Sequence, residues 1–370
     1  MRRGLLLFLA LLVVVGVLAA TLLRRTTPTA ATSASGGQSP AASAGTPASA
    51  PQAGQAPGAS GGTPAGANTF TNPVIDRDFP DPDTLKVGNT YYAYATNANG
   101  MNVQVTHSTD MVHWDWPKEA MPALPRWASL QSGLTWAPEV WPTAAGATYV
   151  MYFVSRDSAS DKQCVGLATS STPDGPFTAQ GDKPFICQVD QGGTIDAASF
   201  VDTDGSRYVL FKNDGNCCGL PTHLYIQKVS ADGLTLEGQP TALIQNDQWW
   251  EGRVVEAPTL WKHNNKYYLF YSANNYAGAD YCIGYAVADN ILGPYTKPLP
   301  GPFVATQSDK GAVVGPGGQD VMVDEKGRTW LMYHSWDPTV SYRFVSIDPL
   351  DWDGDKPVLR GPSRQPEPAP

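Results

Sequence analysis

Short runs of aromatic and β-branched residues recur along the chain after residue 69, each beginning three residues after a turn residue. In the first, Gly88 precedes a run that begins at Tyr91 (YYAYAT), and in the last, Gly327 precedes a run that begins at Trp330 (WLMYHS). Such runs are typical of β-strands, and a preceding Gly or Asn supplies the positive φ of a tight hairpin. Apolar residues at helical spacing are hard to find in this region. The pattern predicts an all-β protein.

The turn residues recur at a nearly constant interval. They are separated by 58, 59, 59 and 63 positions: Gly88, Gly146, Gly205, Asn264 and Gly327. A period of this length indicates one structural unit repeated along the chain. Five equal all-β units predict a five-bladed β-propeller, whose four-stranded blades surround a central channel. The alternative is a series of hairpins in another architecture, such as a sandwich, which seldom keeps one period five times.

The N-terminus has a different character. Residues 4–23 are apolar except for Thr21 and lie between two pairs of arginines, and twenty residues of helix span about 30 Å, the thickness of one bilayer core. Residues 1–25 are therefore predicted to be an uncleaved signal anchor or a cleaved signal peptide, with Val17-x-Ala19 as a weak cleavage site. Either alternative exports the rest of the chain, which is then secreted or tethered to the outer face of the cell membrane.

The composition of the chain after residue 25 changes at about residue 68. Residues 26–68 contain 39 Ala, Pro, Gly, Ser or Thr in 43 positions, with no charged or aromatic residue. Such a segment cannot bury enough apolar surface to offset its ordering entropy, so a disordered linker is predicted. The propeller is predicted over residues 69–361, followed by a flexible tail over residues 362–370.

The charge balance excludes some classes of partner. The formal net charge is −9, and the only charges before residue 69 are four arginines, which leaves −13 on the globular part. So acidic a domain lacks the basic surface that binds nucleic acid or anionic lipid. A neutral ligand and a monomeric state are expected.

An acidic residue lies seven to nine positions before each turn residue, at the start of an apolar strand. These residues are Asp81, Glu139, Asp196, Glu256 and Asp320. Inner strands of a propeller begin near the axis, so we expect the five carboxyls to converge at one mouth of the channel. Converging carboxyls drive their pKa values apart, and one can stay protonated beside an ionised one. For Glu139 and Asp320, capping of strand-end N–H groups is the favoured alternative.

Several segments resemble glycoside hydrolase family 43. They are NPVIDRDFPDPD, the SxDMVHW stretch (Ser108 to Trp114), TWAPEVW, GLATSSTPDGPF, TIDAASF, VVEAPTLW and IGYAVADNILGPY, and the resemblance covers residues 70–355 in order. It implies a five-bladed propeller that hydrolyses arabinofuranosides or xylosides with inversion of configuration.

The resemblance also implies roles for three carboxyls. Asp81 matches the family's general base, Asp196 the residue that orients the acid and tunes its pKa, and Glu256 the general acid. An inverting hydrolase needs an acid and a base about 6.5–9.5 Å apart, which opposite sides of a channel can provide. Asp83, two residues after Asp81, is the main rival for the role of base.

One element departs from the family. Many members carry a histidine in a GPGH element that helps to hold an axial metal ion, whereas this chain has GPGGQD, with Gly318 at that position and Gln319 beside it. The departure argues against an axial calcium ion, and no cofactor is required for the hydrolytic chemistry. The five histidines show no zinc-type spacing, so no metal ligands are predicted.

Aromatic residues near the acids are candidates for sugar binding, because sugar faces stack on flat apolar surfaces. Phe79, Trp136 and Trp249 are the aromatic candidates, and Arg253 could bond to sugar hydroxyls. Packing within the blades is the alternative for each.

The five cysteines fit an oxidising compartment. Cys164 and Cys187 could join one hairpin. Cys217 and Cys218 are adjacent and could pair with each other, or one of them could pair with Cys282. The sequence does not choose between these pairings, and no Cys–His arrangement indicates thiolate catalysis.

The leading hypothesis is an exported inverting glycosidase that cleaves α-L-arabinofuranosyl linkages in plant cell-wall arabinan or arabinoxylan. WEGRVVEAP and the GNCC loop resemble the arabinan-directed members more than the xylosidases. A β-xylosidase of the same family is the first alternative. A non-catalytic carbohydrate-binding propeller is the second, and it would be expected to lack one of the three acids.

Overall fold

The computed structural model describes residues 68–129, 134–309 and 311–370. The predicted signal segment (residues 1–25) and all but the last residue of the predicted linker (residues 26–68) lie outside the described residues. Within the described ranges, no helix is both long and apolar enough to span a bilayer.

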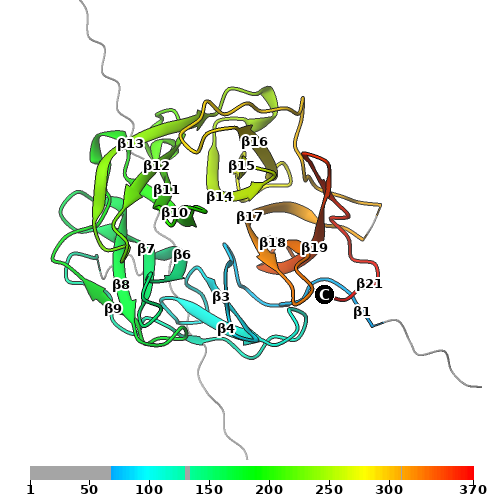
Figure 1. Ribbon diagram of the computed structural model, residues 1–370, viewed down its shortest axis with the longest axis horizontal. Coiled ribbons are helices and arrows are strands. Elements are labelled where there is room, and N and C mark those ends of the chain that lie inside the picture. The colour runs from blue at the N-terminus through cyan, green and yellow to red at the C-terminus, as the bar shows by residue number, and fades with distance from the viewer. Residues whose placement is uncertain (1–67, 130–133, 310) are drawn as a thin grey trace, which may run out of the picture. The chain divides into compact units, whose positions relative to one another are not determined.

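Strands β2 to β20 form five antiparallel sheets arranged around a central axis, with the inner strand of each nearest the centre (Figure 1). Blade one contains β2 (Asp83–Val87), β3 (Thr90–Ala95), β4 (Gln104–Ser108) and β5 (Lys118–Glu119), and blade two contains β6 (Thr135–Pro142), β7 (Tyr149–Asp157), β8 (Lys162–Ser170) and β9 (Thr178–Gln180). Blade three contains β10 (Thr194–Val201), β11 (Arg207–Asn213), β12 (His223–Val229) and β13 (Leu236–Gln245). Blade four contains β14 (Val255–His263), β15 (Lys266–Ala273) and β16 (Cys282–Ala288), and blade five contains β17 (Val314–Val323), β18 (Thr329–Trp336), β19 (Arg343–Asp353) and β20 (Lys356–Leu359). The predicted five-bladed propeller is confirmed.

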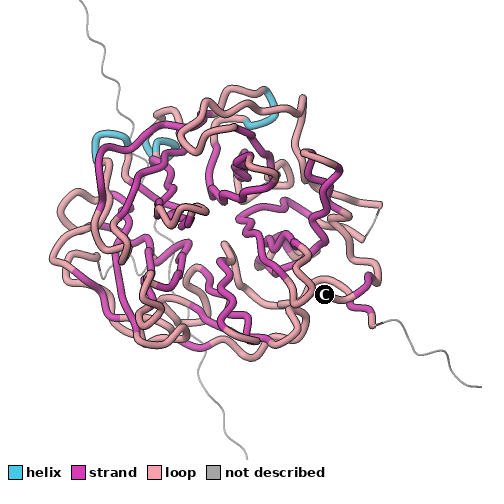
Figure 2. The backbone as a smooth tube through the Cα atoms, viewed as in Figure 1, coloured by secondary structure: helices cyan, strands magenta, loops and turns pink. Residues whose placement is uncertain are grey.

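Blade four departs from the four-stranded pattern. Its sheet has three strands, and the place of a fourth is taken by isolated bridges from Val304 to Ile283 and from Thr296 to Val287. The described helical structure is limited to three short turns, η1 (Val189–Gln191), η2 (Gly215–Cys218) and η3 (Trp249–Glu251), which lie among loops at the blade edges (Figure 2). This accords with the scarcity of helical periodicity in the sequence.

The apolar core lies between the blades. Each of five clusters joins two neighbouring sheets: Val150 on β7 and Phe211 on β11 share one, and Tyr268 on β15 and Tyr333 on β18 share another. A strand with a blade on each side is buried on both faces, which explains why β7 reads as a nearly unbroken apolar run. The centre of the ring is thus left for polar groups.

Both ends of the propeller domain help to close the ring. β1 (Thr69–Phe70) pairs with β21 (Glu367–Pro368), and the backbone of Ile75 bonds to Val345 on β19. The Asn72 amide group donates to the carbonyl of Ile347 and accepts from its N–H. The prediction of a flexible tail over residues 362–370 is therefore wrong, because β21 lies in this segment and holds the start of the domain.

Candidate active site

One residue near the start of each inner strand adopts a left-handed backbone conformation. These residues are Asp81, Ala137, Asp196, Ala257 and Gly318, with φ between 38° and 55°. In blades two to five a break in the strand register accompanies it. A bulge of this kind redirects side chains at a strand end toward a site.

The five predicted acids do not occupy equivalent positions relative to the left-handed residue of their strands. Asp81 and Asp196 are the left-handed residues themselves, and Glu256 comes directly before one. Glu139 and Asp320 come two residues after one, as does Asp83 in blade one. The carboxyls therefore form two sets, one at the left-handed position or beside it and one a step further along the strands.

Both sets line a pocket of about 510 Å³ at the mouth of the channel, as expected for the five acids, and Asp81, Asp196 and Glu256 reach it from blades one, three and four. Trp136 also lines this pocket, as predicted. Lys212, Tyr281 and Arg343 line it as well and were missed. Lys212 could have been found from the sequence, because it ends the apolar run YVLFK of a buried strand. A lysine in a buried strand is almost always paired with an acid, which would have placed Lys212 near one of the predicted carboxyls.

Asp81 is held in its ionised form. The Thr96 hydroxyl donates to its Oδ2 at 2.6 Å, and the Arg343 guanidinium donates to its Oδ1 at 3.3 Å. Burial raises the pKa of Asp81, but Arg343 and the hydrogen bond from Thr96 outweigh burial, so the pKa lies below its ordinary value. An ionised carboxylate in a pocket is suited to accept a proton.

Asp196 has the opposite tendency. Burial and the neighbouring Glu256 carboxylate raise the pKa of Asp196 to about 7, against the opposing effects of Lys212 and of the Ala257 N–H, which donates to Oδ2 at 2.9 Å. Two carboxyls that interact this strongly titrate as a unit. Below about pH 7 the Asp196–Glu256 pair thus holds a proton opposite the ionised Asp81.

Both oxygens of Glu256 are hydrogen-bonded. The Tyr281 hydroxyl donates to Oε1 at 2.9 Å, and the Lys212 ammonium donates to Oε2 at 2.9 Å. The Lys212 side chain is fully buried, and the surrounding carboxylates raise its pKa against the opposing effect of burial, so it remains a cation. These contacts fix the orientation of Glu256 toward the pocket.

The second set of acids links neighbouring blades. Asp83 accepts from the N–H of Val140 at 2.8 Å, Glu139 from the N–H of Ser199 at 2.9 Å, and Asp320 from the N–H of Thr84 at 3.0 Å. The alternative that Glu139 and Asp320 bind backbone N–H groups agrees with these contacts. Burial, together with the neighbouring Glu139 and Asp320, raises the pKa of Asp83 well above its usual range, so Asp83 is a poorer candidate for a base than Asp81.

Three of the four predicted substrate-binding residues lie elsewhere. Phe79 is fully buried in the apolar cluster between blades five and one, and packing there excludes contact with a sugar. Trp249 is 83% exposed, and its indole N–H donates to the carbonyl of Pro300. Neither Trp249 nor the exposed Arg253 lines the pocket. Trp249 and Arg253 lie on the connection between β13 and β14, which contains η3, and their closeness to Glu256 in sequence did not reveal that this connection lies away from the pocket.

Gly318 leaves no space for the histidine that many family members carry at this position. A Cβ atom at Gly318 would lie 2.5 Å from Cε1 and Nδ1 of His334, so the buried His334 ring fills the space of a side chain there. His334 Nδ1 accepts the backbone N–H of Asp81 at 2.9 Å, and burial lowers the pKa of His334 to about 3, which keeps the ring neutral. Among the described residues, no group of three or more His, Cys, Asp or Glu could hold a metal ion.

The cysteine pairings left open by the sequence are resolved. Cys164 bonds to Cys187 and Cys217 bonds to Cys218, which leaves Cys282 as a buried free thiol. Cys217 belongs to η2 and also lines the pocket.

The chain matches known proteins over most of the described domain. Residues 70–357 match the family described as glycosyl hydrolases family 43. A solved structure described as a thermostable family-43 glycoside hydrolase has a TM-score of 0.72 at 34% sequence identity, over 82% of this chain and 99% of that chain.

Curated relatives carry different specificities in their names. A Xylanibacter ruminicola protein whose name points to β-xylosidase is 30% identical over 298 residues, which are 80% of this chain and 51% of that protein. An extracellular endo-alpha-(1->5)-L-arabinanase of Thermotoga petrophila is 27% identical over 257 residues, which are 59% of this chain and 50% of that protein. The chain thus spans about half the length of these two relatives. The family match, which extends across all five blades, shows that this chain belongs to glycoside hydrolase family 43.

Proposed function

We propose that the chain is an exported, inverting glycosidase that cleaves α-L-arabinofuranosyl linkages in plant arabinan or arabinoxylan. The observation that carries the proposal is the division of the pocket carboxyls, with an ionised Asp81 on one side and a protonated Asp196–Glu256 pair on the other. Acid and base catalysis at one site needs carboxyls in opposite protonation states.

In the proposed reaction, Asp81 removes a proton from a water molecule that attacks the anomeric carbon. Arg343 and Thr96 keep Asp81 ionised and fix its position. Asp81 precedes blade one and Glu256 lies in blade four, so water and leaving group would occupy opposite faces of the sugar. Such a displacement inverts the anomeric configuration.

Glu256 protonates the oxygen of the departing sugar. The Asp196–Glu256 pair supplies the proton, and Tyr281 and Lys212 hold the Glu256 carboxyl in place. Once Glu256 has given up its proton, Lys212 stabilises the resulting carboxylate. Asp196 therefore acts on the reaction through Glu256.

The choice of sugar rests on the resemblance of WEGRVVEAP and GNCC to arabinan-directed members, and it agrees with the arabinanase among the relatives. The xylosidase name of the Xylanibacter relative favours a β-xyloside as the second candidate. A non-catalytic carbohydrate-binding role is disfavoured because all three acids are present. Export is proposed from the apolar stretch at residues 4–23, with residues 26–68 as a spacer.

The test compares hydrolysis of 4-nitrophenyl α-L-arabinofuranoside and 4-nitrophenyl β-D-xyloside, followed by product analysis on debranched arabinan, arabinoxylan and xylo-oligosaccharides. We expect far faster cleavage of the arabinofuranoside. Equal or reversed rates would refute the arabinan assignment and leave the hydrolase assignment intact.

Early NMR spectra of the product test the stereochemistry. We expect the first-formed sugar to have the anomeric configuration opposite to that of the substrate. A retained configuration would indicate a covalent intermediate with carboxyls only about 5–5.5 Å apart, and the roles assigned to Asp81 and Glu256 would have to be given up.

A further inference from the structure

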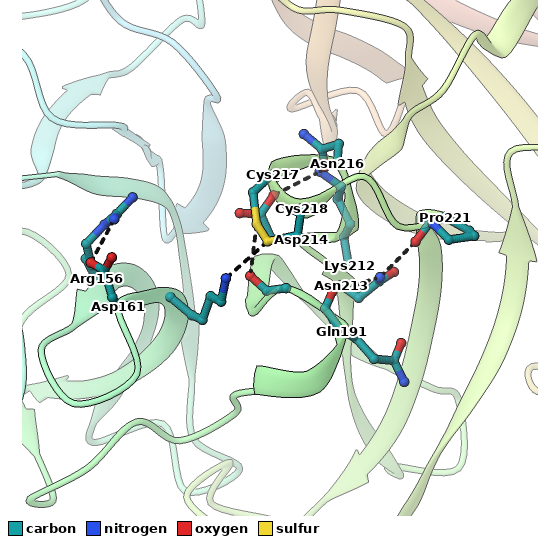
Figure 3. Close-up of a disulfide and its surroundings, with 12 residues drawn as sticks. Arg156, Asp161, Gln191, Lys212, Asn213, Asp214, Asn216, Cys217, Cys218 and Pro221 are labelled. Carbon is teal, nitrogen blue, oxygen red and sulfur yellow. Dashed lines mark hydrogen bonds and ion pairs between the residues drawn. A yellow bond between two sulfur atoms is a disulfide. The ribbon is translucent and has the colours of Figure 1, made fainter. Parts of the chain in front are cut away.

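The loop that joins β11 to β12 carries a disulfide between adjacent residues at the rim of the pocket. Cys217 and Cys218 are both exposed, and Cys217 and the preceding Asn216 line the pocket (Figure 3). The mechanism above uses neither cysteine.

The loop is held in a fixed position. The buried Asn213 amide donates to the carbonyls of Pro221 and Gln191 and accepts the N–H of His223. The backbone is also tightly packed at Gly215, where a Cβ atom would lie only 2.3 Å from the carbonyl oxygen of Pro221. The disulfide is therefore presented on a rigid base.

A short chain of hydrogen bonds connects this loop to the candidate acid. Lys212 Nζ donates to Asn216 Oδ1 at 2.7 Å and to Glu256 Oε2 at 2.9 Å. The loop belongs to blade three, across the ring from the junction of blades five and one, where Arg343 and Asp81 lie (Figure 1). It thus lies on the side of the pocket toward which the leaving group departs.

The chemistry of the loop suits a sugar ring. Disulfide sulfur atoms form a polarisable, apolar surface of the kind that packs against C–H groups, as sulfur does in protein cores and binding sites. Asn216 adds an amide group beside it, and sugar pockets combine apolar surface with a few placed polar groups. The Lys162 ammonium donates to Cys218 Sγ at 3.1 Å and so helps to hold the disulfide in place.

We propose that Asn216 and the Cys217–Cys218 disulfide form the subsite that binds the departing sugar, with the disulfide against one face of its ring. This inference rests on the proposed function, since a leaving-group subsite has meaning only for a glycosidase. It makes the disulfide a determinant of which oligosaccharides are cleaved.

The test uses two substrates that share the cleaved sugar and differ in the leaving group. An arabinofuranosyl disaccharide has a sugar to bind in the subsite, whereas α-L-arabinofuranosyl fluoride has none. For Cys217→Ser/Cys218→Ser we expect kcat/KM to fall about 10-fold on the disaccharide, mostly through KM, which is the lower end of the cost of losing an apolar contact in a pocket. Hydrolysis of the fluoride should stay within about twofold of wild type, and Cys282→Ser, which alters the buried free thiol, serves as the matched control.

An equal loss on both substrates, or no loss on either, would overturn the proposal. If wild type cleaves only the xylo-series substrates, the same comparison is made with xylobiose and β-D-xylosyl fluoride, which separates failure of the sugar assignment from failure of the subsite.

A second measurement does not depend on the folding of the serine variant. In Asp81→Asn protein, which should leave an oligosaccharide intact, saturating arabinotriose should slow reduction of Cys217–Cys218 by a phosphine, as followed by alkylation and mass spectrometry. Reduction of Cys164–Cys187, where Cys164 is fully buried, should be unaffected. Unchanged reduction of Cys217–Cys218 under saturating oligosaccharide would also overturn the proposal. If wild type hydrolyses no substrate of either series, the proposed glycosidase fails, and this protection still decides whether sugar binds at the disulfide.

Discussion

Glu256 lies between groups with opposing effects on its charge. Lys212 and Tyr281 donate hydrogen bonds that favour its carboxylate, whereas the neighbouring Asp196 carboxyl disfavours a second negative charge. Below about pH 7 this pair of carboxyls therefore holds a proton, since burial and the Glu256 carboxylate raise the pKa of Asp196 to about 7. An arrangement of this kind keeps an acid available near neutral pH while Asp81 remains ionised.

The division of labour between Asp81 and Glu256 predicts different responses to the leaving group. Glu256→Gln should lose about 10²–10⁴-fold on oligosaccharides but much less on an aryl glycoside, because a weakly basic leaving group needs little protonation. Asp81→Asn should be severely impaired on both, since water then lacks a base. Steady-state kcat/KM on the two substrate types measures this, and equal losses for Glu256→Gln on both would contradict its role as the acid.

Asp196→Asn predicts a displaced pH profile. The acid must be protonated, so activity falls as pH rises through the pKa of the Asp196–Glu256 pair, about 7 for Asp196. Asp196→Asn removes the group whose pKa is raised to about 7, so the alkaline limb of kcat/KM should move to lower pH. An unchanged limb, with activity merely reduced, would indicate that Asp196 only positions Glu256.

Gly318 and His334 bear on metal dependence. Because Gly318 stands where many family members carry a metal-binding histidine, and the His334 ring leaves no space for a side chain there, treatment with a chelator should leave most activity. The measurement is the rate on the preferred aryl glycoside before and after dialysis against EDTA. A complete loss that calcium restores would mean that other groups, such as Gln319, hold an essential ion.

Among the strands, folding raises the pKa values of the three acids that link blades, Asp83, Glu139 and Asp320. Burial raises the pKa of Glu139 to about 7 and that of Asp320 to about 6. A carboxyl whose pKa is raised by folding stabilises the fold below its ordinary pKa, and this contribution is lost as pH rises through the folded value. The inter-blade contacts should thus weaken between about pH 4 and pH 7.

Glu139→Gln tests this dependence. The amide oxygen can still accept from the N–H of Ser199 but cannot ionise. The free energy of unfolding of the variant should exceed that of wild type increasingly with pH, from little difference at pH 4 to on the order of 3 kcal/mol at pH 8. Denaturant titrations at several pH values measure it, with the exposed Glu237→Gln as control. Parallel curves for Glu139→Gln and wild type would contradict the assignment.

The sequence predicted the strands of the blades but not the bulges within their inner strands. A period of about 59 residues predicted the blades, because strand composition and turn residues are local properties. It did not show that Glu139 and Asp320 lie two residues beyond the positions of Asp81 and Asp196, because a left-handed residue such as Ala137 or Ala257 has no distinctive side chain. The burial of Phe79 and the outward direction of Trp249 depend on tertiary packing, which no local pattern records.

At the scale of the whole molecule, stability is distributed around the ring. Each blade packs only against its two neighbours, and five apolar clusters of similar kind replace a single central core. This leaves the axis free for a polar pocket whose walls come from all five blades. The roles of Asp81 in blade one and Glu256 in blade four therefore require that the ring be closed.

The pairing of β1 with β21 allows the polypeptide to be joined at its ends and cut elsewhere. Since β1 and β21 are paired, a short peptide can join Pro370 to Asn68, and new ends can be opened elsewhere as a circular permutant. Opened at Gly205, in the turn between β10 and β11, the permutant keeps its new first and last strands bonded within one sheet, so we expect it to fold and retain activity. Opened at Asp247, between blades three and four, its new first strand β14 and its new last strand β13 lie in different sheets, and its melting temperature should be clearly lower. Equal melting temperatures for the two permutants would mean that side-chain packing between blades is enough to hold the ring closed, without pairing between the first and last strands.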